Sequence, residues 1–411
     1  MKNVNKKIIF LLSFIMLLCI FGIIFGKSIN AKQVNNKKII YVSQKRNKKS
    51  TGSKKYPFVS LQKAIDKADA GTVIYIREGN YKGPFIFHKS GNKKRGYITI
   101  AAYKNEKVNI SNKDNISAAV FDMGGQSYIK IQKLHIGNIK AENVCGILMK
   151  NSESSIVIEK CEFRNIITTR PGSIEKPGGE ANAVILLGEK KKSIHHVYIL
   201  GNKVHDNING WSENISVAGN CTNIYVQNNK VYNNTNIGID FYGNAGYCDD
   251  LTMDQPRNCK CIDNTVYNCK SSFAENAGIY IDGAKDILVK GNKTFKNHYG
   301  IEVGSEEWKS YYTKENYVRD IKISENIMYN NLYCGLRIGG WSNDKTTGTV
   351  YDCKVINNDF SKGNKKDEII LAKCDGILFK DNRFKNNSKC PENVKYDDGI
   401  SRNKIKNIVF K

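Results

Sequence analysis

Residues 287–294 read ILVKGNKT, an alternation of apolar and polar residues that ends in a Gly-Asn turn, and related stretches recur along most of the chain. They are SYIKIQKLHI (127–136), IVIEKCEF (156–163), VYILGNKV (197–204), IYVQNNKV (224–231), CKCIDNTV (259–266), IKISENIM (321–328), CKVINNDF (353–360) and ILFKDNRF (377–384). The turn position that they share falls every 24 to 41 residues on Leu134, Cys161, Asn202, Asn228, Asn264, Asn292, Asn326, Asn358 and Asn382. A module of variable length that repeats in this way predicts a solenoid, and the two-residue alternation predicts that it is built from strands.

A second short strand recurs in the modules and usually opens with glycine. Its members are GILM (146–149), AVIL (183–186), ISVA (215–218), GIDFY (238–242), GIYID (278–282), GIEV (300–303) and GLRI (335–338). Two or three such strands per module, stacked in register, predict an all-β parallel β-helix whose coils are about 4.8 Å apart. We expect the asparagine row to be structural, because stacked side-chain amides satisfy turn backbone groups.

The N-terminal segment predicts export. Residues 1–27 contain a basic start followed by the apolar run 8–25 and small residues that place a cleavage site near Ser28. The apolar run is also close to the length that spans a bilayer, so a cleaved signal peptide and an uncleaved membrane anchor both remain open. In either case we expect the body of the protein to be secreted or held on the cell surface.

The rest of the chain divides into a tether and one domain. Residues 28–57 are a lysine-rich tether and the start of a cap, and residues 58–411 are the β-helix domain. The domain opens with a short amphipathic helix that Ser60 can cap and Gly71 can end, which would cover the first coil. Twelve cysteines at irregular spacing do not form a disulfide framework.

The formal net charge of +25 favours an anionic partner. We expect an acidic polysaccharide, with an anionic cell wall as a further contact, and a monomeric protein. Nucleic acid is excluded as a partner because the chain is exported and contains no nucleic-acid-binding motif.

When the glycine-led strands are aligned, their apolar residues point inward and the residues between them point outward. One outward row reads Ser216, Asp240, Tyr280, Glu302 and Arg337, and the parallel row reads Ala218, Tyr242, Asp282, Gly304 and Gly339. Long insertions beside these strands (165–182, 243–258, 304–320 and 340–352) would wall a groove, and they or nearby segments carry Trp211, Trp308, Tyr311, Tyr312 and Trp341. Aromatic side chains of this kind offer flat apolar surfaces to sugar rings, so the rows and walls together predict a carbohydrate-binding groove.

The chain resembles right-handed parallel β-helix proteins of the pectate-lyase-like superfamily over residues 38–411. PFVSLQKAIDKADAGTVIYIREGNYKG (57–83), GIYIDG (278–283) and YGIEVGSE (299–306) carry the resemblance. YGIEVG and CGLRIGG (334–340) resemble a motif pair of family nine polysaccharide lyases, which implies Glu302 as a calcium ligand and Arg337 as the basic catalytic residue. The chain departs from that family at His298 and Tyr299, where paired aspartates are usual, and at Arg337, where lysine is usual.

Three functions are consistent with the predicted groove. A lyase would use Ca²⁺ held by Asp240 and Glu302, with Asp282 as a further acidic group, to neutralise a uronate carboxylate during β-elimination. Arg337 would be its base or carboxylate clamp, and Tyr280 or Lys285 would be alternative bases.

A glycoside hydrolase would instead use two of the three carboxylates Asp240, Asp282 and Glu302, and a non-catalytic scaffold would only bind glycan. In each case Trp308, Trp341, Tyr242 and His298 are the expected substrate contacts. The basic residue in the row favours the lyase, or the related epimerase, acting on an acidic polysaccharide.

Overall fold

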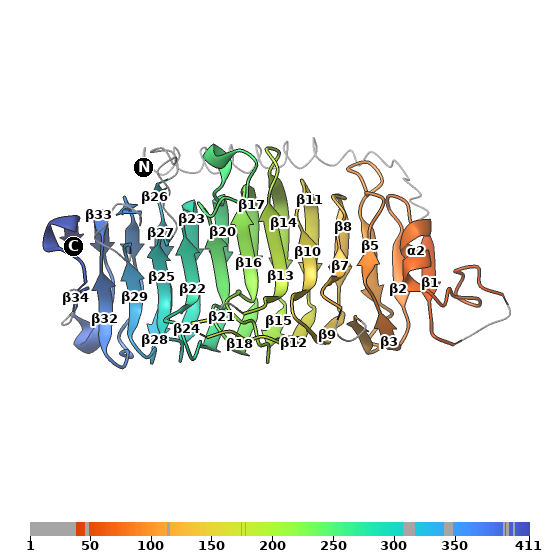
Figure 1. The fold of residues 1–411 in the computed structure, drawn as a ribbon, viewed down its shortest axis with the longest axis horizontal. Coiled ribbons are helices and arrows are strands. Elements are labelled where there is room, and N and C mark those ends of the chain that lie inside the picture. The colour runs from red at the N-terminus through yellow and green to blue at the C-terminus, as the bar shows by residue number, and fades with distance from the viewer. Residues whose placement is uncertain are drawn as a thin grey trace, which may run out of the picture. The chain divides into compact units, whose positions relative to one another are not determined.

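The computed structural model describes residues 38–45, 49–112, 116–173, 175–176, 178–306, 317–340, 348–388, 391, 394–397 and 399–411. Residues 38–411 form one compact unit, a right-handed parallel β-helix of three sheets whose coils stack in sequence order (Figure 1). The predicted fold class is therefore confirmed. No helix within the described ranges is both long and apolar enough to cross a membrane. The predicted export segment lies outside them.

Sheet A has 15 strands and supplies the first strand of most coils. Its members are β1 (Ile39–Val42), β2 (Val73–Ile76), β5 (Ile98–Ala102), β8 (Ile129–Gln132), β11 (Ser154–Glu159), β14 (Ile194–Leu200), β17 (Cys221–Gln227), β20 (Arg257–Ile262), β23 (Lys285–Lys290), β26 (Val318–Arg319), β27 (Lys322–Ser324), β30 (Val350–Tyr351), β31 (Lys354–Ile356), β33 (Cys374–Lys380) and β35 (Ile405–Phe410). β1 pairs in parallel with β2, so the β-helix begins before residue 58, within the stretch assigned to the tether.

Sheet B has nine strands and sheet C has eleven. Sheet B comprises β3 (Gly79–Lys82), β6 (Val108–Ser111), β9 (His135–Ala141), β12 (Glu162–Thr168), β15 (Lys203–His205), β18 (Lys230–Asn234), β21 (Thr265–Cys269), β24 (Lys293–Phe295) and β28 (Ile327–Tyr329). Sheet C comprises β4 (Phe85–Ile86), β7 (Ala119–Asp122), β10 (Val144–Met149), β13 (Ala181–Gly188), β16 (Ile215–Gly219), β19 (Ile239–Tyr242), β22 (Ala277–Asp282), β25 (Tyr299–Gly304), β29 (Cys334–Ile338), β32 (Asp367–Leu371) and β34 (Val394–Tyr396).

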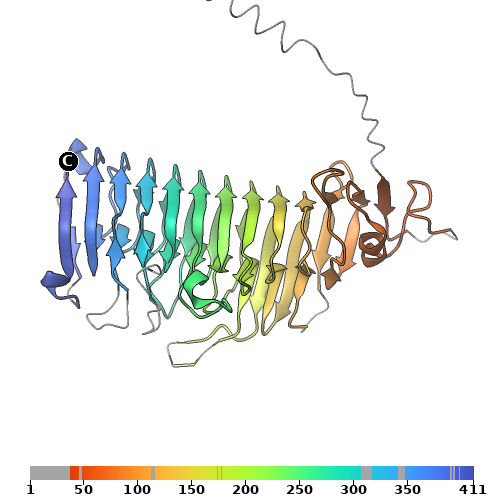
Figure 2. The same ribbon diagram turned by 90° about the horizontal axis from the view of Figure 1, so that it is seen from above.

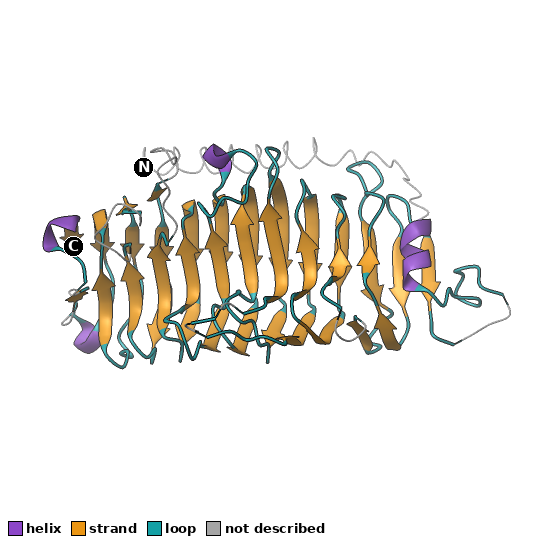
Figure 3. Ribbon diagram, viewed as in Figure 1, coloured by secondary structure: helices purple, strands orange, loops and turns teal. Residues whose placement is uncertain are grey.

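Helix α2 (Leu61–Lys67) lies at the N-terminal end of the described coils (Figure 3). The Ser60 side chain accepts a hydrogen bond from the backbone N–H of Lys63 at 3.2 Å, as a cap should. Leu61, Ala64 and Ile65 are buried on the core side, where they cover the end of the solenoid. The helix ends at Lys67, earlier than expected, and Gly71 lies in the turn that follows.

The asparagine row is confirmed as a structural ladder, with one correction. The backbone N–H of Asn264 donates to Asn292 Oδ1 at 2.8 Å, and that of Asn292 donates to Asn326 Oδ1 at 2.8 Å. The ladder member of its coil is Asn229, which is 1% exposed, and not Asn228, which is exposed in a left-handed conformation (φ 57°). Each link satisfies a buried turn N–H, so the row stabilises the stacking of coils.

A second ladder, which the repeat alignment missed, runs at the far end of sheet B. Asn207, Asn297 and Asn331 donate their backbone N–H groups to the side-chain oxygens of Asn234, Asn331 and Asn364, at 3.0, 3.2 and 3.1 Å. The core between the ladders is apolar throughout, with inward residues such as Phe241, Ile281 and Val303 fully buried. Ten cysteines in the described ranges are buried and free, as expected for small core residues.

Candidate active site

The strand register of sheet C confirms both outward rows. Ser216 pairs with Asp240, Asp240 with Tyr280, Tyr280 with Glu302, and Glu302 with Arg337. In the parallel row Ala218 pairs with Tyr242, Tyr242 with Asp282, and Asp282 with Gly304. The alternation predicted from the glycine-led strands thus places these side chains on one face.

The face is not open to solvent, because loops and neighbouring side chains cover it. Asp240, Tyr280 and Asp282 are each 2% exposed. The loop that precedes β13 and the loop that carries the short 3₁₀ helix (Leu251–Met253) project from the same side of the coils (Figure 2). The outward rows are therefore the floor of a recess and not a solvated strand surface.

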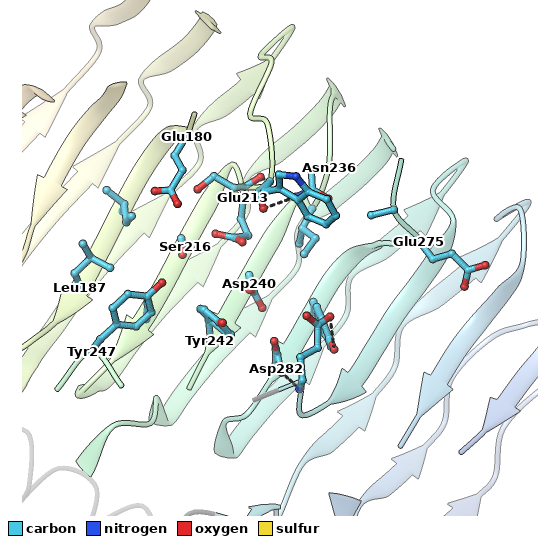
Figure 4. Close-up of a pocket in the computed structure, with 18 residues that line it drawn as sticks. Glu180, Leu187, Glu213, Ser216, Asn236, Asp240, Tyr242, Tyr247, Glu275 and Asp282 are labelled. Atoms are coloured by element: carbon cyan, nitrogen blue, oxygen red, sulfur yellow. Dashed lines mark hydrogen bonds between the residues drawn. The ribbon is translucent and has the colours of Figure 1, made fainter. Parts of the chain in front are cut away.

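A cavity of about 380 Å³ lies over β16, β19 and β22. Six acidic side chains line it, and Figure 4 shows them with the other lining residues: Glu180, Glu213, Asp240, Glu275, Asp282 and Glu306. Among the described residues that line the cavity, none is lysine, arginine or histidine. The local charge of the site is thus opposite to the net charge of the chain.

Aromatic rings form the walls of this cavity. Trp211, 41% exposed, packs against Phe273 with ring centroids 4.7 Å apart, and Tyr242 meets Tyr247 edge to face at 5.8 Å. Tyr247 is held in place through Asp254, whose Oδ1 accepts a hydrogen bond from the Cys248 N–H at 3.0 Å. Asp254 is fully buried and fixes the loop, which thereby holds the Tyr247 ring against the cavity.

The carboxyl groups of the cavity have strongly perturbed proton affinities. Burial raises the pKa of Glu213 to about 7, against a hydrogen bond from Ser216 that lowers it. Burial, followed by the charge of Glu213, raises the pKa of Asp240 well above its usual range. Burial and then Glu306 raise the pKa of Asp282 in the same way. Neighbouring carboxyl groups with raised pKa values are typical of sites that perform acid–base catalysis.

Hydrogen bonds hold one side of the cluster and leave one oxygen unpartnered. The Glu306 N–H donates to Asp282 Oδ1 at 2.9 Å, and the Tyr280 hydroxyl donates to Glu306 Oε1 at 3.2 Å. Asp240 Oδ1 is buried and has no hydrogen-bond partner among the described residues. A buried oxygen without a partner is costly, so a proton, a ligand or a cation is expected to satisfy it.

Glu302 and Arg337 lie outside the cavity lining and engage each other. Arg337 Nη1 contacts Glu302 Oε1 at 3.0 Å and donates to the Gly339 carbonyl at 2.9 Å, while its Nη2 contacts Asp397 Oδ2 at 3.2 Å. Both partners of the central pair are 1% exposed. Burial raises the pKa of Glu302 to about 8, although Arg337 acts to lower it. Arg337 is thus tied into a buried network between coils.

Of the other predicted site residues, some line the cavity and some lie elsewhere on the coils. Tyr242, Tyr280, Asp240 and Asp282 line the cavity, as just described. Lys285 begins β23 in sheet A, on a different sheet from the rows. His298 is buried next to β25, and its ring lies 5.3 Å from that of Tyr333. Trp308 and Trp341 lie outside the described residues.

Sequence reasoning missed Glu180, Glu213, Glu275 and Glu306 because they stand next to the glycine-led strands and not within them. Glu213 comes two residues before β16, and Glu306 two residues after β25. For Glu275 and Glu306, an acidic residue that flanks a strand already carrying an outward carboxylate would have been the signal, whereas β13 and β16 carry no carboxylate and gave no such signal for Glu180 and Glu213.

Carboxylate oxygens, the ligand atoms that Ca²⁺ prefers, line the cavity, and Asp240 Oδ1 has no hydrogen-bond partner among the described residues. Asp240 and Glu302, the predicted ligand pair, lie two coils apart, about 10 Å at the usual strand spacing, so they do not meet on one ion. The charges of Glu213 and Asp282 both act on Asp240 and raise its pKa. No group of three His, Cys, Asp or Glu side chains in the described ranges is gathered closely enough to hold a metal by itself.

Comparisons with known proteins agree with this architecture. A family model described as Pel9A-like, right-handed β-helix region, matches residues 40–279. The chain is 30% identical over 379 residues to the uncharacterized protein YwoF of Bacillus subtilis (strain 168), an alignment that covers 88% of this chain and 76% of YwoF.

Two solved structures share the fold at low identity. A rhamnogalacturonan lyase superposes with a TM-score of 0.51 at 12% identity, covering 90% of this chain and 86% of that one. PfbA, a surface adhesin of Streptococcus pneumoniae, superposes with a TM-score of 0.50 at 15% identity, covering 78% and 79%. One of these proteins is named as a lyase and the other as an adhesin, so the fold does not choose the chemistry.

Proposed function

Because the chain belongs to the Pel9A-like right-handed β-helix family, we propose that it is a carbohydrate-active enzyme that cleaves glycosidic bonds in the carboxylate cavity. The observation that carries the proposal is the pair Glu213 and Asp240, two neighbouring carboxyl groups with raised pKa values in a cavity walled by aromatic rings. Hydrolysis by a general acid and a general base is the chemistry that this pair supports best.

The two groups take different roles. Burial and the charge of Glu213 both oppose ionisation of Asp240 and raise its pKa, so we assign it as the general acid that protonates the departing glycosidic oxygen. Glu213 titrates near pH 7 and, once ionised, accepts a proton from the water that attacks the anomeric carbon. The oxygen of the water bonds to that carbon as the bond between the carbon and the oxygen of the leaving sugar breaks. Asp240 has then given up a proton, and Glu213 has gained one.

The charge of the cavity bears on the substrate. A cavity lined by acidic side chains and by no described cationic side chain gives a uronate carboxylate no positive partner, so the hydrolase acts on a neutral stretch of glycan. Trp211 and Tyr247 provide the apolar faces against which a sugar ring packs. The export segment predicted from the sequence would place this glycan outside the cell membrane.

Calcium-assisted β-elimination of an acidic polysaccharide is the second candidate, and two observations favour it. The family description names a Pel9A-like region, and Asp240 Oδ1 is a buried oxygen without a partner. Because no three described acidic side chains are close enough together to hold Ca²⁺ by themselves, the ion would be bound by Asp240 together with the carboxylate of the substrate, whose negative charge it would neutralise. Tyr280, whose hydroxyl already donates to Glu306, would be the base in this site, since Arg337 and Lys285 do not line it.

One experiment separates the candidates. The purified 28–411 protein is incubated with neutral glycans, pectate, alginate and glycosaminoglycans, each with Ca²⁺ and with chelator, while reducing ends and the absorbance of unsaturated uronates are followed. Reducing ends without that absorbance, insensitive to chelator and lost in Asp240→Asn, support hydrolysis. Calcium-dependent absorbance on a uronate polymer would reject hydrolysis and support the lyase. Binding without any product would reject both enzymes and support a glycan-binding surface protein.

A further inference from the structure

A second hollow, of about 370 Å³, lies on the turn between sheets A and B, away from the carboxylate cavity on sheet C. Four exposed lysines from successive coils line it, together with His135: Lys104, Lys133, Lys160 and Lys203. We call this site the lysine hollow. Its floor is formed by the buried turn residues Ala102, Leu134 and Cys161.

The carboxylates near the lysine hollow already have partners. Glu106 binds Arg77 through two hydrogen bonds of 2.8 Å, and Glu159 binds Lys130 at 2.9 Å. Glu162 is held by His135 and, at 3.1 Å, by His205; burial alone would raise its pKa, but these two hydrogen bonds lower it overall. Glu106 and Glu162 line the hollow themselves, so its four lysines stand against two carboxylates and leave it net positive.

Three of these lysines occupy backbone positions that favour other residue types. Lys104, Lys133 and Lys160 have φ angles of 54°, 58° and 53°, in the left-handed region where a lysine side chain is disfavoured and Gly, Asn or Asp is usual. In the coils that follow, the same turn position is taken by Gly201, Asn228 and Asp263. The hollow thus departs from the residue types that the turn prefers.

Lys133 and Lys160 are also direct neighbours on stacked coils. The Lys133 N–H donates to the carbonyl of Glu159, one residue before Lys160, which sets the two turns one strand spacing apart, about 4.8 Å. Like charges at that spacing repel, so the pair adds an electrostatic cost to the backbone cost. An anion bound between them would remove the repulsion and would offset the cost of placing two lysines in left-handed turns.

We propose that the lysine hollow binds the phosphate groups of a phosphodiester polymer. Lysine is a compact point charge that can meet the oxygens of a phosphate group from several directions, and no arginine, whose planar fork makes two-point contacts with carboxylates and phosphates alike, lines the hollow among its described residues. Lysines on consecutive coils present their charges along the solenoid axis, which is the arrangement an extended polyanion can follow. This binding site is independent of the chemistry in the carboxylate cavity.

The test uses the 28–411 protein and synthetic poly(glycerol phosphate), with polygalacturonate as the comparison polymer. The double variant Lys133→Gln/Lys160→Gln should weaken poly(glycerol phosphate) binding about fivefold, from two exposed charge contacts. The slope of log affinity against log salt concentration should also fall by about 1.5, since fewer counterions are released. The matched control is Lys322→Gln/Lys354→Gln, two exposed lysines that pair in register on adjacent coils of sheet A.

Equal losses in the two double variants would reduce the effect to net charge and overturn the proposal. Polygalacturonate binding that is as tight and as sensitive to Lys133→Gln/Lys160→Gln would overturn the assignment to phosphate. A second variant, Lys133→Asn/Lys160→Asn, provides the readout on folding, because asparagine tolerates the left-handed turn. It should raise the melting temperature while losing polymer binding; a lowered melting temperature would show that the lysines serve the fold.

Discussion

Replacing Glu213 with glutamine should make the protein more stable at pH 8 and leave its stability at pH 4.5 nearly unchanged. Folding raises the pKa of this carboxyl group from 4.5 to about 7, so the folded state binds the proton more tightly than the unfolded state. The stabilisation that this provides is fully present below pH 4.5 and is lost as the pH rises to about 7. Glutamine is neutral throughout and has no such loss.

The magnitude follows from the same numbers. A pKa raised from 4.5 to about 7 corresponds to about 3 kcal/mol of unfolding free energy, and the partial exposure of Glu213 reduces the expected value to about 2 kcal/mol. Denaturant unfolding of the native sequence and of Glu213→Gln, at pH 4.5 and at pH 8, measures it. Glu325→Gln, which removes an exposed carboxylate paired with Lys290, is the matched control.

Catalysis gives the second readout of the same substitution. If Glu213 is the base, kcat/KM of the native enzyme rises with pH up to about 7, and Glu213→Gln loses that rise together with about 10²- to 10⁴-fold of the rate. A variant whose stability depends on pH as the native protein's does would refute the burial argument. A variant that keeps the native pH–rate profile would refute the catalytic role.

Three further substitutions test the fold and the site. Asn292→Ala should lower the unfolding free energy by about 3 kcal/mol, because it leaves buried ladder partners unsatisfied, whereas Asn228→Gly, at the exposed position beside the ladder, should change it little; denaturant titrations compare the two. Arg337→Met should cost about 3–5 kcal/mol of stability by leaving Glu302 buried without its partner, and a stable but inactive variant would instead return Arg337 to the catalytic site. Trp211→Ala should raise KM about tenfold with kcat little changed, as loss of a stacking surface predicts, and a selective loss of kcat in steady-state kinetics would contradict this.

The sequence could predict the coils and the rows because both rest on short-range periodicity. Glycine near the start of most of these sheet C strands indicates the register, and a two-residue alternation then decides which side chain points outward. Asp240 and Tyr280 were placed as neighbours by that rule alone, and the structure pairs them. The repeat alignment chose the wrong asparagine in one coil, IYVQNNKV (224–231). Two adjacent asparagines there allow alternative alignments, and Asn229 is the one that joins the ladder.

What the sequence could not predict depends on contacts between distant segments. Arg337 reads as an exposed row residue, yet Asp397, 60 residues later, and Glu302 enclose it. Glu213 lies outside the alternating strand, so periodicity carries no information about where its side chain points. Its raised pKa arises from burial under loops, a three-dimensional property that no spacing encodes.

The coil that contains β13, β14 and β15 takes part in both sites, since Leu187 lines the carboxylate cavity and Lys203 lines the lysine hollow. Because its strands β13 and β14 are hydrogen-bonded to the coils on both sides, this coil holds the two sites at a fixed separation. The two sites are then linked through local concentration. A protein held by one polymer at its turns keeps the cavity within a fixed reach of any glycan attached to the same surface, and its apparent affinity for that glycan exceeds that of the isolated cavity.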